Sequence, residues 1–237
     1  MTWSIVARDA DGAFGVAVAS RFFAVGALCP NARSGIGALS TQALVNPGYG
    51  PRGLDLLEQG VGAADAVAQL VGADEGREHR QLHLIDRRGR CAAHTGALCI
   101  DWCGHLAYDG FSVAGNMLAG PAVLDETARA YQAHAGAPFA ERLLAAMSAG
   151  EAAGGDKRGK QAAALLIHTT EIYPFLDLRV DDHPDPIAEL KRLHQVSLER
   201  YQPFLACLPN AARPAGVTDR AAIEAEVERF QAARRQR

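Results

Sequence analysis

The sequence has few features of a membrane, secreted or nucleic-acid-binding protein. No apolar run reaches the roughly 18 residues that a membrane span requires. The residues after Met1 enter a strand-like pattern directly, without the basic and apolar segments of a secretory signal. With 24 Lys and Arg against 27 Asp and Glu, the net charge is −3, which argues against the basic surface that binds nucleic acid.

Cysteine is also scarce. The chain has five cysteines, and an odd number in a chain without a predicted signal is typical of reduced thiols in the cytosol. We therefore expect a cytoplasmic protein with no membrane partner and no nucleic-acid partner.

Several familiar catalytic signatures are missing. The sequence contains neither a Gly-x-Ser-x-Gly elbow nor a His-Glu-x-x-His helix motif. The glycine-rich segment 154–161 does not have the spacing of a phosphate-binding P-loop. These absences exclude the usual motifs of serine esterases, zinc peptidases and P-loop nucleotide enzymes.

Strand patterns and helix patterns alternate in pairs along the chain of 237 residues. Asp11 and Gly12 supply turn chemistry between two runs of β-forming residues, which predicts a hairpin of strands 2–8 and 14–20. Further strands are predicted at residues 36–41, 81–85, 91–95, 111–114, 162–167 and 175–180. Helices are predicted at residues 51–58, 63–71, 121–133, 138–149, 186–205 and 218–234.

Hairpins between helix pairs argue against a doubly wound parallel sheet. They favour an α+β fold in which two antiparallel sheets stack face to face and helices cover the outer faces. We expect this sandwich to occupy residues 1–180. Residues 181–237 are predicted to form a helical extension that packs on the core or on a second subunit, as in a homodimer.

Thr2 is the starting point of a catalytic interpretation. The initiator methionine is commonly removed before a small residue, and its removal gives Thr2 a free α-amine beside its own hydroxyl. An α-amine has a pKa of about 7.7–8.0, so part of it is free base at neutral pH. That base can activate the hydroxyl without a histidine. Position 2 alone is a weak signal, because most proteins that begin Met-Thr are not hydrolases.

Six blocks of sequence carry a resemblance to a known family. They are TWSIVARD from Thr2, VAVASRFFAVG from Val16, TQALVNPGYGPRGL from Thr41, HTG from His94, GNMLAG from Gly115 and AAGGDKRGKQAAALL from Ala152. Between Thr2 and about Ile167 the chain resembles the DUF1028 proteins, a family of unknown function in the N-terminal-nucleophile hydrolase superfamily. The resemblance implies a four-layer αββα sandwich with an N-terminal threonine at the end of a central strand.

Further catalytic candidates surround this threonine in the predicted hairpin. Ser20 and Arg21 end the strand expected to pair with Thr2, and Ser20 is a candidate proton relay. Arg33 or Arg21 is a candidate cation that lowers the pKa of the amine, although a solvated loop charge is the alternative for Arg33. Asn116 ends another strand, where its amide either stabilises an oxyanion or caps a turn.

Two polar loops are candidates for substrate binding. Arg158 has the planar geometry that clamps a carboxylate, and Asp156 is expected to hold an amine or to orient Arg158. A solvated, flexible turn is the alternative for that loop. The complete candidate set is Gln42, Asn46, Tyr49 and Arg52 in the first loop, with Asp156, Arg158 and Gln161 in the second.

A group of possible zinc ligands falls within fifteen positions: Cys91, His94, Cys99, Cys103 and His105. Its spacing is compatible with a structural zinc site. Cysteine in an alternating strand is also a common small core residue, and the chemistry implied by the resemblance needs no metal. We therefore predict no metal and no cofactor.

The interpretation that these residues favour is an amidohydrolase. Thr2 would cleave a non-peptide or small-peptide amide bond of a small polar substrate after removal of Met1. A non-catalytic small-molecule-binding or assembly protein on the same fold is the alternative, favoured if Met1 is retained. A zinc-dependent hydrolase is the third possibility.

Overall fold

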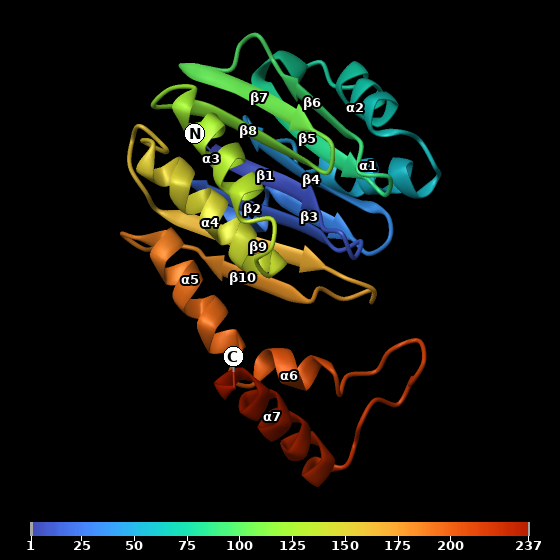
Figure 1. Ribbon diagram of the computed structural model, residues 1–237. Coiled ribbons are helices and arrows are strands. Elements are labelled where there is room, and N and C mark those ends of the chain that lie inside the picture. The colour runs from blue at the N-terminus through green and yellow to red at the C-terminus, as the bar shows by residue number, and fades with distance from the viewer. Residues whose placement is uncertain (1, 237) are drawn as a thin grey trace. The chain divides into compact units, whose positions relative to one another are not determined.

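The computed structural model describes residues 2–236, which contain two antiparallel sheets (Figure 1). The six-stranded sheet has the order β10-β9-β2-β1-β8-β7. Its strands are β1 (Thr2–Arg8), β2 (Phe14–Ser20), β7 (Trp102–Tyr108), β8 (Phe111–Leu118), β9 (Ala162–His168) and β10 (Leu176–Val180). The four-stranded sheet has the order β3-β4-β5-β6, with β3 (Pro30–Arg33), β4 (Gly37–Ala43), β5 (Arg80–Asp86) and β6 (Cys91–Thr95).

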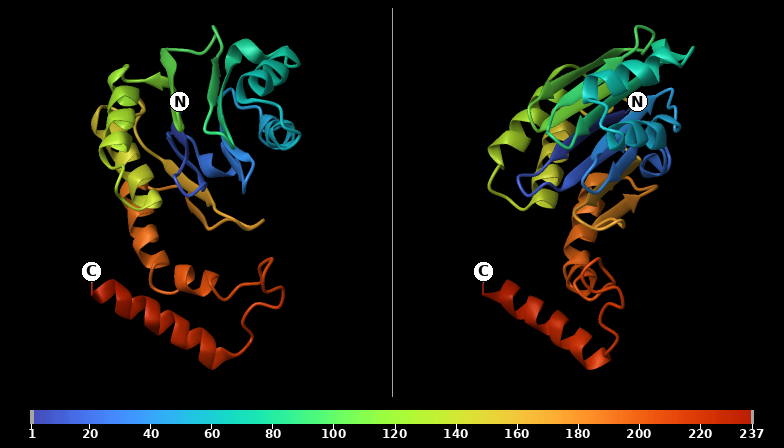
Figure 2. Two further views of the ribbon diagram at one scale, coloured as in Figure 1. Left: turned by 45° about the vertical axis from the view of Figure 1, so that its right-hand side comes forward. Right: turned by 90° about the vertical axis from the view of Figure 1, so that its right-hand side faces the viewer.

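Two pairs of helices cover the outer faces of the two sheets. Helices α1 (Tyr49–Glu58) and α2 (Ala63–Gly72) pack on β3, β4, β5 and β6, and α3 (Ala122–Ala133) and α4 (Phe139–Ala152) pack on β1, β2, β8 and β9. The left view of Figure 2 shows the two sheets edge on, between the helix pairs. The predicted four-layer αββα sandwich is confirmed.

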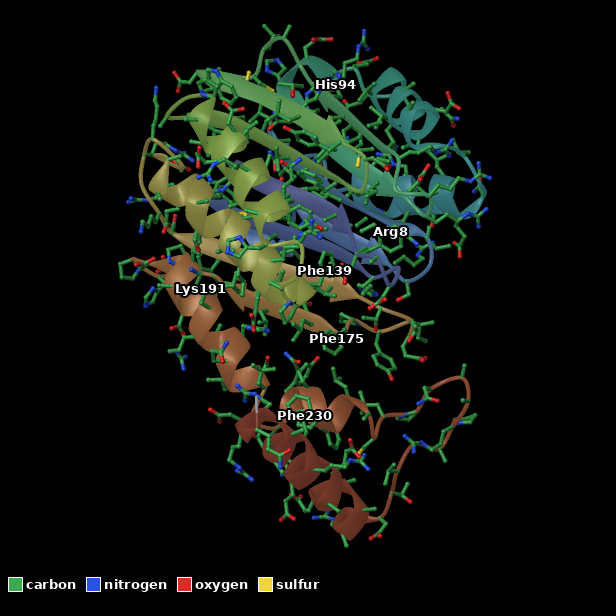
Figure 3. All side chains as sticks on the ribbon, in the orientation of Figure 1. Arg8, His94, Phe139, Phe175, Lys191 and Phe230 are labelled. Carbon is green, nitrogen blue, oxygen red and sulfur yellow. The ribbon has the colours of Figure 1, made fainter. Side chains whose placement is uncertain are left out.

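The inward faces of the two sheets change from polar to apolar along the strands. Near the start of β1 they carry Thr2, Ser20, Gln42, Gln81 and Asn116, all of them buried. Toward the other end of β1, which Arg8 marks in Figure 3, they carry the apolar cluster of Val6, Phe14, Val16, Ala38 and Ile85. Burial of polar groups costs free energy unless hydrogen bonds satisfy them, so the polar end requires a bonded network.

Most elements agree with the prediction from the sequence, and the differences have physical causes. Strands β3 and β7 were not predicted, because both are edge strands without the alternation of buried and exposed apolar residues. The predicted helix 186–205 is divided into α5 (Pro186–Ser197) and α6 (Tyr201–Leu205). Pro203 lies in the first turn of α6, where a missing N–H is tolerated.

The chain divides into two compact units, one that ends at Leu190 and one that begins at Lys191. The sequence placed the end of the sandwich at residue 180, before the start of α5. Within the second unit, Asp219 caps α7 (Arg220–Arg235), and Arg200 forms an ion pair with Glu224 at 2.6 Å. Across residues 2–236, no helix is long and apolar enough to cross a membrane.

Candidate active site

Thr2 begins a strand in the interior of the six-stranded sheet. It pairs with Ser20 on β2 and with Asn116 on β8. Directly paired residues of antiparallel strands point to the same face, so the three side chains share the inward face. The Thr2 hydroxyl donates a hydrogen bond to Ser20 Oγ at 3.2 Å. The structure thus brings together three of the four residues proposed from the sequence as catalytic. The predicted removal of Met1 concerns a residue outside the described range.

Two side-chain amides hold the carbonyl oxygen of Thr2. Asn116 Nδ2 donates to it at 3.4 Å, and Gln42 Nε2 donates at 3.5 Å from the opposite sheet. Both amides also donate to Gln81 Oε1, at 3.0 and 2.7 Å respectively. Because its donors are already engaged, Asn116 fits a positioning role better than the oxyanion role considered from the sequence.

Gln81 connects the two sheets at this point, and no pattern in the sequence singled it out. The two protons of its Nε2 are shared among three acceptors, the carbonyl oxygens of Gly115 at 2.8 Å and Gly104 at 3.0 Å and Thr95 Oγ1 at 2.9 Å. Gln81 is fully buried, so all of its hydrogen-bonding capacity is satisfied inside the protein. It fixes the two amides that bind Thr2.

A second chain of hydrogen bonds runs behind Gln42. Ser4 Oγ donates to Gln42 Oε1 at 2.7 Å and lies 2.8 Å from His83 Nε2. His83 Nδ1 lies 2.6 Å from Ser112 Oγ. Since the Ser4 proton is used on Gln42, His83 donates from Nε2 and accepts at Nδ1. Burial, followed by the nearby charge of His105, lowers the pKa of His83 to about 3, so the imidazole is neutral.

Acidification is expected to destabilise the fold through His83. The pKa of His83 is about 3 in the folded state and about 6.5 when unfolded. The unfolded chain therefore binds the proton more strongly, and the free energy of unfolding falls as the pH drops from about 6.5 toward 3. The limiting slope is about 1.4 kcal/mol per pH unit for one group.

Urea unfolding at about pH 7, 6 and 5 measures this slope for the protein and for His83→Gln. The variant is expected to have a smaller slope. Some slope remains, because burial also lowers the pKa values of His105 and His168. Equal slopes in the two proteins would contradict the assignment to His83.

The residues that follow the two amides have strained backbones. Ala43, after Gln42, has φ 69°, and Met117, after Asn116, has φ 54°. Residues other than glycine rarely adopt positive φ, and the conformation costs about 1–2 kcal/mol. Such strain is often found at functional sites. Here it occurs where β4 and β8 end beside Thr2.

The second polar loop lies next to Ser20. The Asp156 carboxylate accepts from the backbone N–H groups of Arg21 and Arg158, each at 2.8 Å, and from Arg158 Nη2 at 3.3 Å. The backbone N–H of Gln161 donates to the carbonyl oxygen of Ser20 at 3.2 Å. Its side-chain amide donates to Asp182 Oδ1, also at 3.2 Å. Asp156 therefore anchors the loop, and Arg158 stays partly exposed at its edge.

A cavity of about 380 Å³ opens beside Thr2. Its wall is formed by the segment after β2, by the end of β4 and by the start of β5. The lining residues are Thr2, Phe22, Val25, Leu28, Cys29, Gln42, Ala43, Leu44, Val45 and Arg80. Thr2 therefore lines a space large enough to hold a small ligand.

Arg33 is not brought to this site. It pairs with Gly37 at the end of β4 that lies farthest along the strand from Gln42. Its guanidinium contacts Glu58 at 2.5 Å and Asp55 at 3.0 Å on α1. This placement corrects the proposal that Arg33 lowers the pKa of the Thr2 amine, and it matches the solvated charge considered as the alternative.

Asn46 and Tyr49 serve a structural cluster around Asp74. Asn46 Nδ2 and Tyr49 OH donate to its Oδ2 at 2.9 and 2.8 Å, and Arg80 Nε donates at 3.2 Å. These hydrogen bonds, above all the one from Asn46, hold the pKa of Asp74 well below its usual range. Arg52 donates to the carbonyl oxygen of Gly48 at 3.0 Å on the exposed side of α1. Asn46, Tyr49 and Arg52 do not line the cavity at Thr2.

The Cys and His group has other contacts. His94, labelled in Figure 3, contacts the Arg77 carbonyl oxygen at 2.9 Å through Nε2. His105 Nδ1 contacts Thr95 Oγ1, also at 2.9 Å. Burial raises the pKa of Cys91 to about 12, which keeps its thiol protonated. In the part of the chain that the structure describes, no three His, Cys, Asp or Glu side chains converge as a metal site would require.

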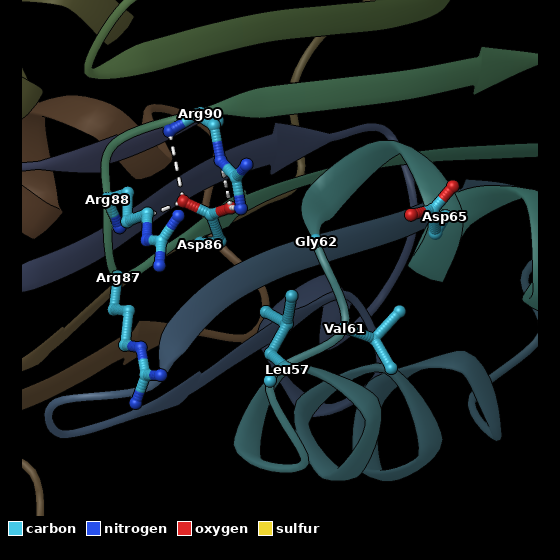
Figure 4. A pocket seen from close by; sticks show the side chains of 9 residues that line it. Leu57, Val61, Gly62, Asp65, Asp86, Arg87, Arg88 and Arg90 are labelled. Atoms are coloured by element: carbon cyan, nitrogen blue, oxygen red, sulfur yellow. Dashed lines mark hydrogen bonds and ion pairs between the residues drawn. The ribbon is translucent and has the colours of Figure 1, made fainter.

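A separate cavity of about 220 Å³ lies between the α1–α2 connection and the β5–β6 turn (Figure 4). Arg87, Arg88 and Arg90 line it with Asp86 and Asp65. Burial alone would raise the pKa of Asp86, but hydrogen bonds from Arg90 and from backbone N–H groups outweigh it and lower the pKa. Asp86 pairs with Gly37, at the end of the sheet away from Gln42.

Comparison with known proteins identifies relatives of the chain. A family model described as a family of unknown function, DUF1028, matches residues 2–190. The crystal structure of protein SPO2555 from Silicibacter pomeroyi, also assigned to DUF1028, has a TM-score of 0.85 and 32% sequence identity, covering 92% of this chain and 96% of that chain. Anbu (ancestral beta-subunit) from Yersinia bercovieri has a TM-score of 0.36 and 14% identity, covering 88% and 98% respectively. No curated protein matches the chain. The chain therefore belongs to the DUF1028 family.

Proposed function

We propose that the protein is an amidohydrolase of the N-terminal-nucleophile superfamily with Thr2 as its nucleophile. The observation that carries the proposal is the position of Thr2. It starts a strand in the sheet interior, borders a cavity, and is held through its carbonyl oxygen by two amides from opposite sheets. A purely structural threonine at the end of a strand does not require this arrangement.

The mechanism needs only the N-terminal residue and water. Once Met1 is removed, the α-amine of Thr2 takes the hydroxyl proton as Oγ1 bonds to the substrate carbonyl carbon. The tetrahedral intermediate collapses, the C–N bond breaks, and the proton passes to the leaving amine. Water then attacks the resulting ester, again with the α-amine as base, and releases the acid and the free hydroxyl.

Neighbouring residues support these steps. Ser20, within 3.2 Å of the Thr2 hydroxyl, orients it or relays its proton. Gln42, Asn116 and the bridging Gln81 fix the backbone of Thr2, which fixes the direction of attack. Arg158, anchored through Asp156 beside Ser20, is available to orient the leaving group.

Intact mass is the first test. We expect the mature protein to lack Met1, because only then is the Thr2 nitrogen a base rather than part of a peptide bond. The same sample is assayed against a panel of acyl amides, acyl-amino acids and small peptides. Complete retention of Met1 in a preparation from the native host would overturn the mechanism and favour the non-catalytic binding protein.

The cytoplasmic location and the homodimer expected from the sequence stay predictions.

A further inference from the structure

We propose that the substrate carries an apolar acyl group, which binds in the cavity beside Thr2. This proposal rests on the proposed function, because it takes the Thr2 hydroxyl as the nucleophile that attacks the acyl carbon. It changes the expectation of a small polar substrate: the polar part is limited to the amide and its leaving group.

The cavity wall is mainly apolar. Val25 and Cys29 are buried in it, and Leu28 and Val45 are partly buried. Burial raises the pKa of Cys29 to about 12, so its thiol is neutral and behaves as a small apolar group. Such a wall desolvates an acyl chain without leaving a charge unpaired.

The charged residue of the wall is already engaged. Arg80 Nε contacts Asp74 Oδ2 at 3.2 Å, and its Nη1 donates to the carbonyl oxygen of Leu44 at 2.5 Å. The Asp74 carboxylate compensates the guanidinium charge at short range. Arg80 therefore shapes the cavity and has a limited capacity to bind an anionic substrate.

The mouth of the cavity exposes large apolar side chains. Phe22 is 53% exposed and Leu44 is 62% exposed, and both line the space next to Thr2. Ligand sites are typically apolar clefts of about 300–1,000 Å³ with a few polar groups, and this cavity of about 380 Å³ fits a medium-length acyl chain. The polar groups at its inner end are Thr2 and Gln42, where the amide would react.

Chain-length dependence tests the proposal. The probes are the N-acetyl, N-butanoyl and N-hexanoyl derivatives of one amine, 4-nitroaniline. Burial of each added methylene is expected to raise kcat/KM roughly fourfold. Turnover that is independent of chain length, or fastest with the acetyl compound, would overturn the apolar acyl group while leaving the hydrolase intact.

Binding measurements on the Thr2→Ala variant test whether the cavity binds an acyl chain, independently of whether Thr2 hydrolyses an amide. Calorimetric titration with butanamide and with hexanamide is expected to show tighter binding of the longer amide, by roughly an order of magnitude. If this difference is found but the unsubstituted protein hydrolyses no amide, the cavity assignment stands and the proposed reaction fails. Equal or undetectable binding of both amides would contradict the cavity assignment.

Two exposed leucines provide a matched pair of variants. Leu44 is 62% exposed and lines the cavity, whereas Leu98 is 54% exposed and lies outside it. Leu44→Asn is expected to lower the hexanoyl-to-acetyl ratio of kcat/KM about tenfold, and Leu98→Asn to leave it unchanged. If Leu44→Asn instead dissociates an oligomer in light scattering and leaves the ratio unchanged, the mouth is a subunit contact and the proposal is wrong.

Discussion

Replacement of Thr2 by alanine is expected to abolish amide hydrolysis, with a loss in kcat of roughly 10⁶-fold, as found when a hydroxyl nucleophile is removed from a hydrolase. The loss is this large because Oγ1 forms the bond to the acyl carbon in the first step and is displaced in the second. The neighbouring Ser20 hydroxyl, 3.2 Å away, is a poor substitute, because Ser20 lies within β2 and has no free α-amine to act as its base.

The fold should survive this substitution. Alanine removes one hydrogen bond, Thr2 Oγ1 to Ser20 Oγ, which contributes about 1 kcal/mol. Circular dichroism and the urea midpoint check that the variant is folded. Thr2→Ser is the matched control, because it keeps both the hydroxyl and the α-amine and should retain measurable turnover. Full activity in Thr2→Ala would end the nucleophile assignment.

Replacement of Gln81 by leucine is expected to lower the free energy of unfolding by several kcal/mol. Leucine fills a similar volume but forms none of the five hydrogen bonds of the Gln81 side chain. The carbonyl oxygens of Gly104 and Gly115 lose a donor, and the amides of Gln42 and Asn116 lose their common acceptor. Each buried group left unsatisfied costs about 1–3 kcal/mol.

Urea unfolding at neutral pH measures the effect. Gln69→Leu, on the exposed side of α2, is the matched control and should change stability by no more than about 0.5 kcal/mol. The remaining folded Gln81→Leu protein should also have a reduced kcat, because the two amides no longer have a fixed position against Thr2. A midpoint equal to that of the control would show that the network contributes little.

The fold was largely predictable because local patterns determine it. The Asp11 and Gly12 turn defines the first hairpin, and apolar residues at helical spacing define α4. The edge strands β3 and β7 were missed because their residues are mostly half-exposed, so periodicity carries little information about them.

The site was only partly predictable. Thr2, Ser20 and Asn116 were found because they stand at strand ends within recognisable blocks. Gln81 and His83 were not found, because their importance depends on the packing of one sheet on the other, which joins residues 35 and 79 positions apart. Spacing along one strand does not encode that contact. Arg33 was misplaced for the same reason.

The two left-handed residues beside the site have an evolutionary consequence. Glycine at position 43 or 117 would remove a conformational cost of about 1–2 kcal/mol. The greater chain entropy of glycine in the unfolded state would offset about 0.5–1 kcal/mol of this gain in stability. A laboratory selection for heat tolerance alone would therefore accept glycine at both positions. Selection for turnover would oppose glycine there, because a more flexible backbone after Gln42 or Asn116 would hold the side-chain amides less firmly against Thr2. Ala43 and Met117 are therefore positions at which a substitution that stabilises the fold is expected to lower activity.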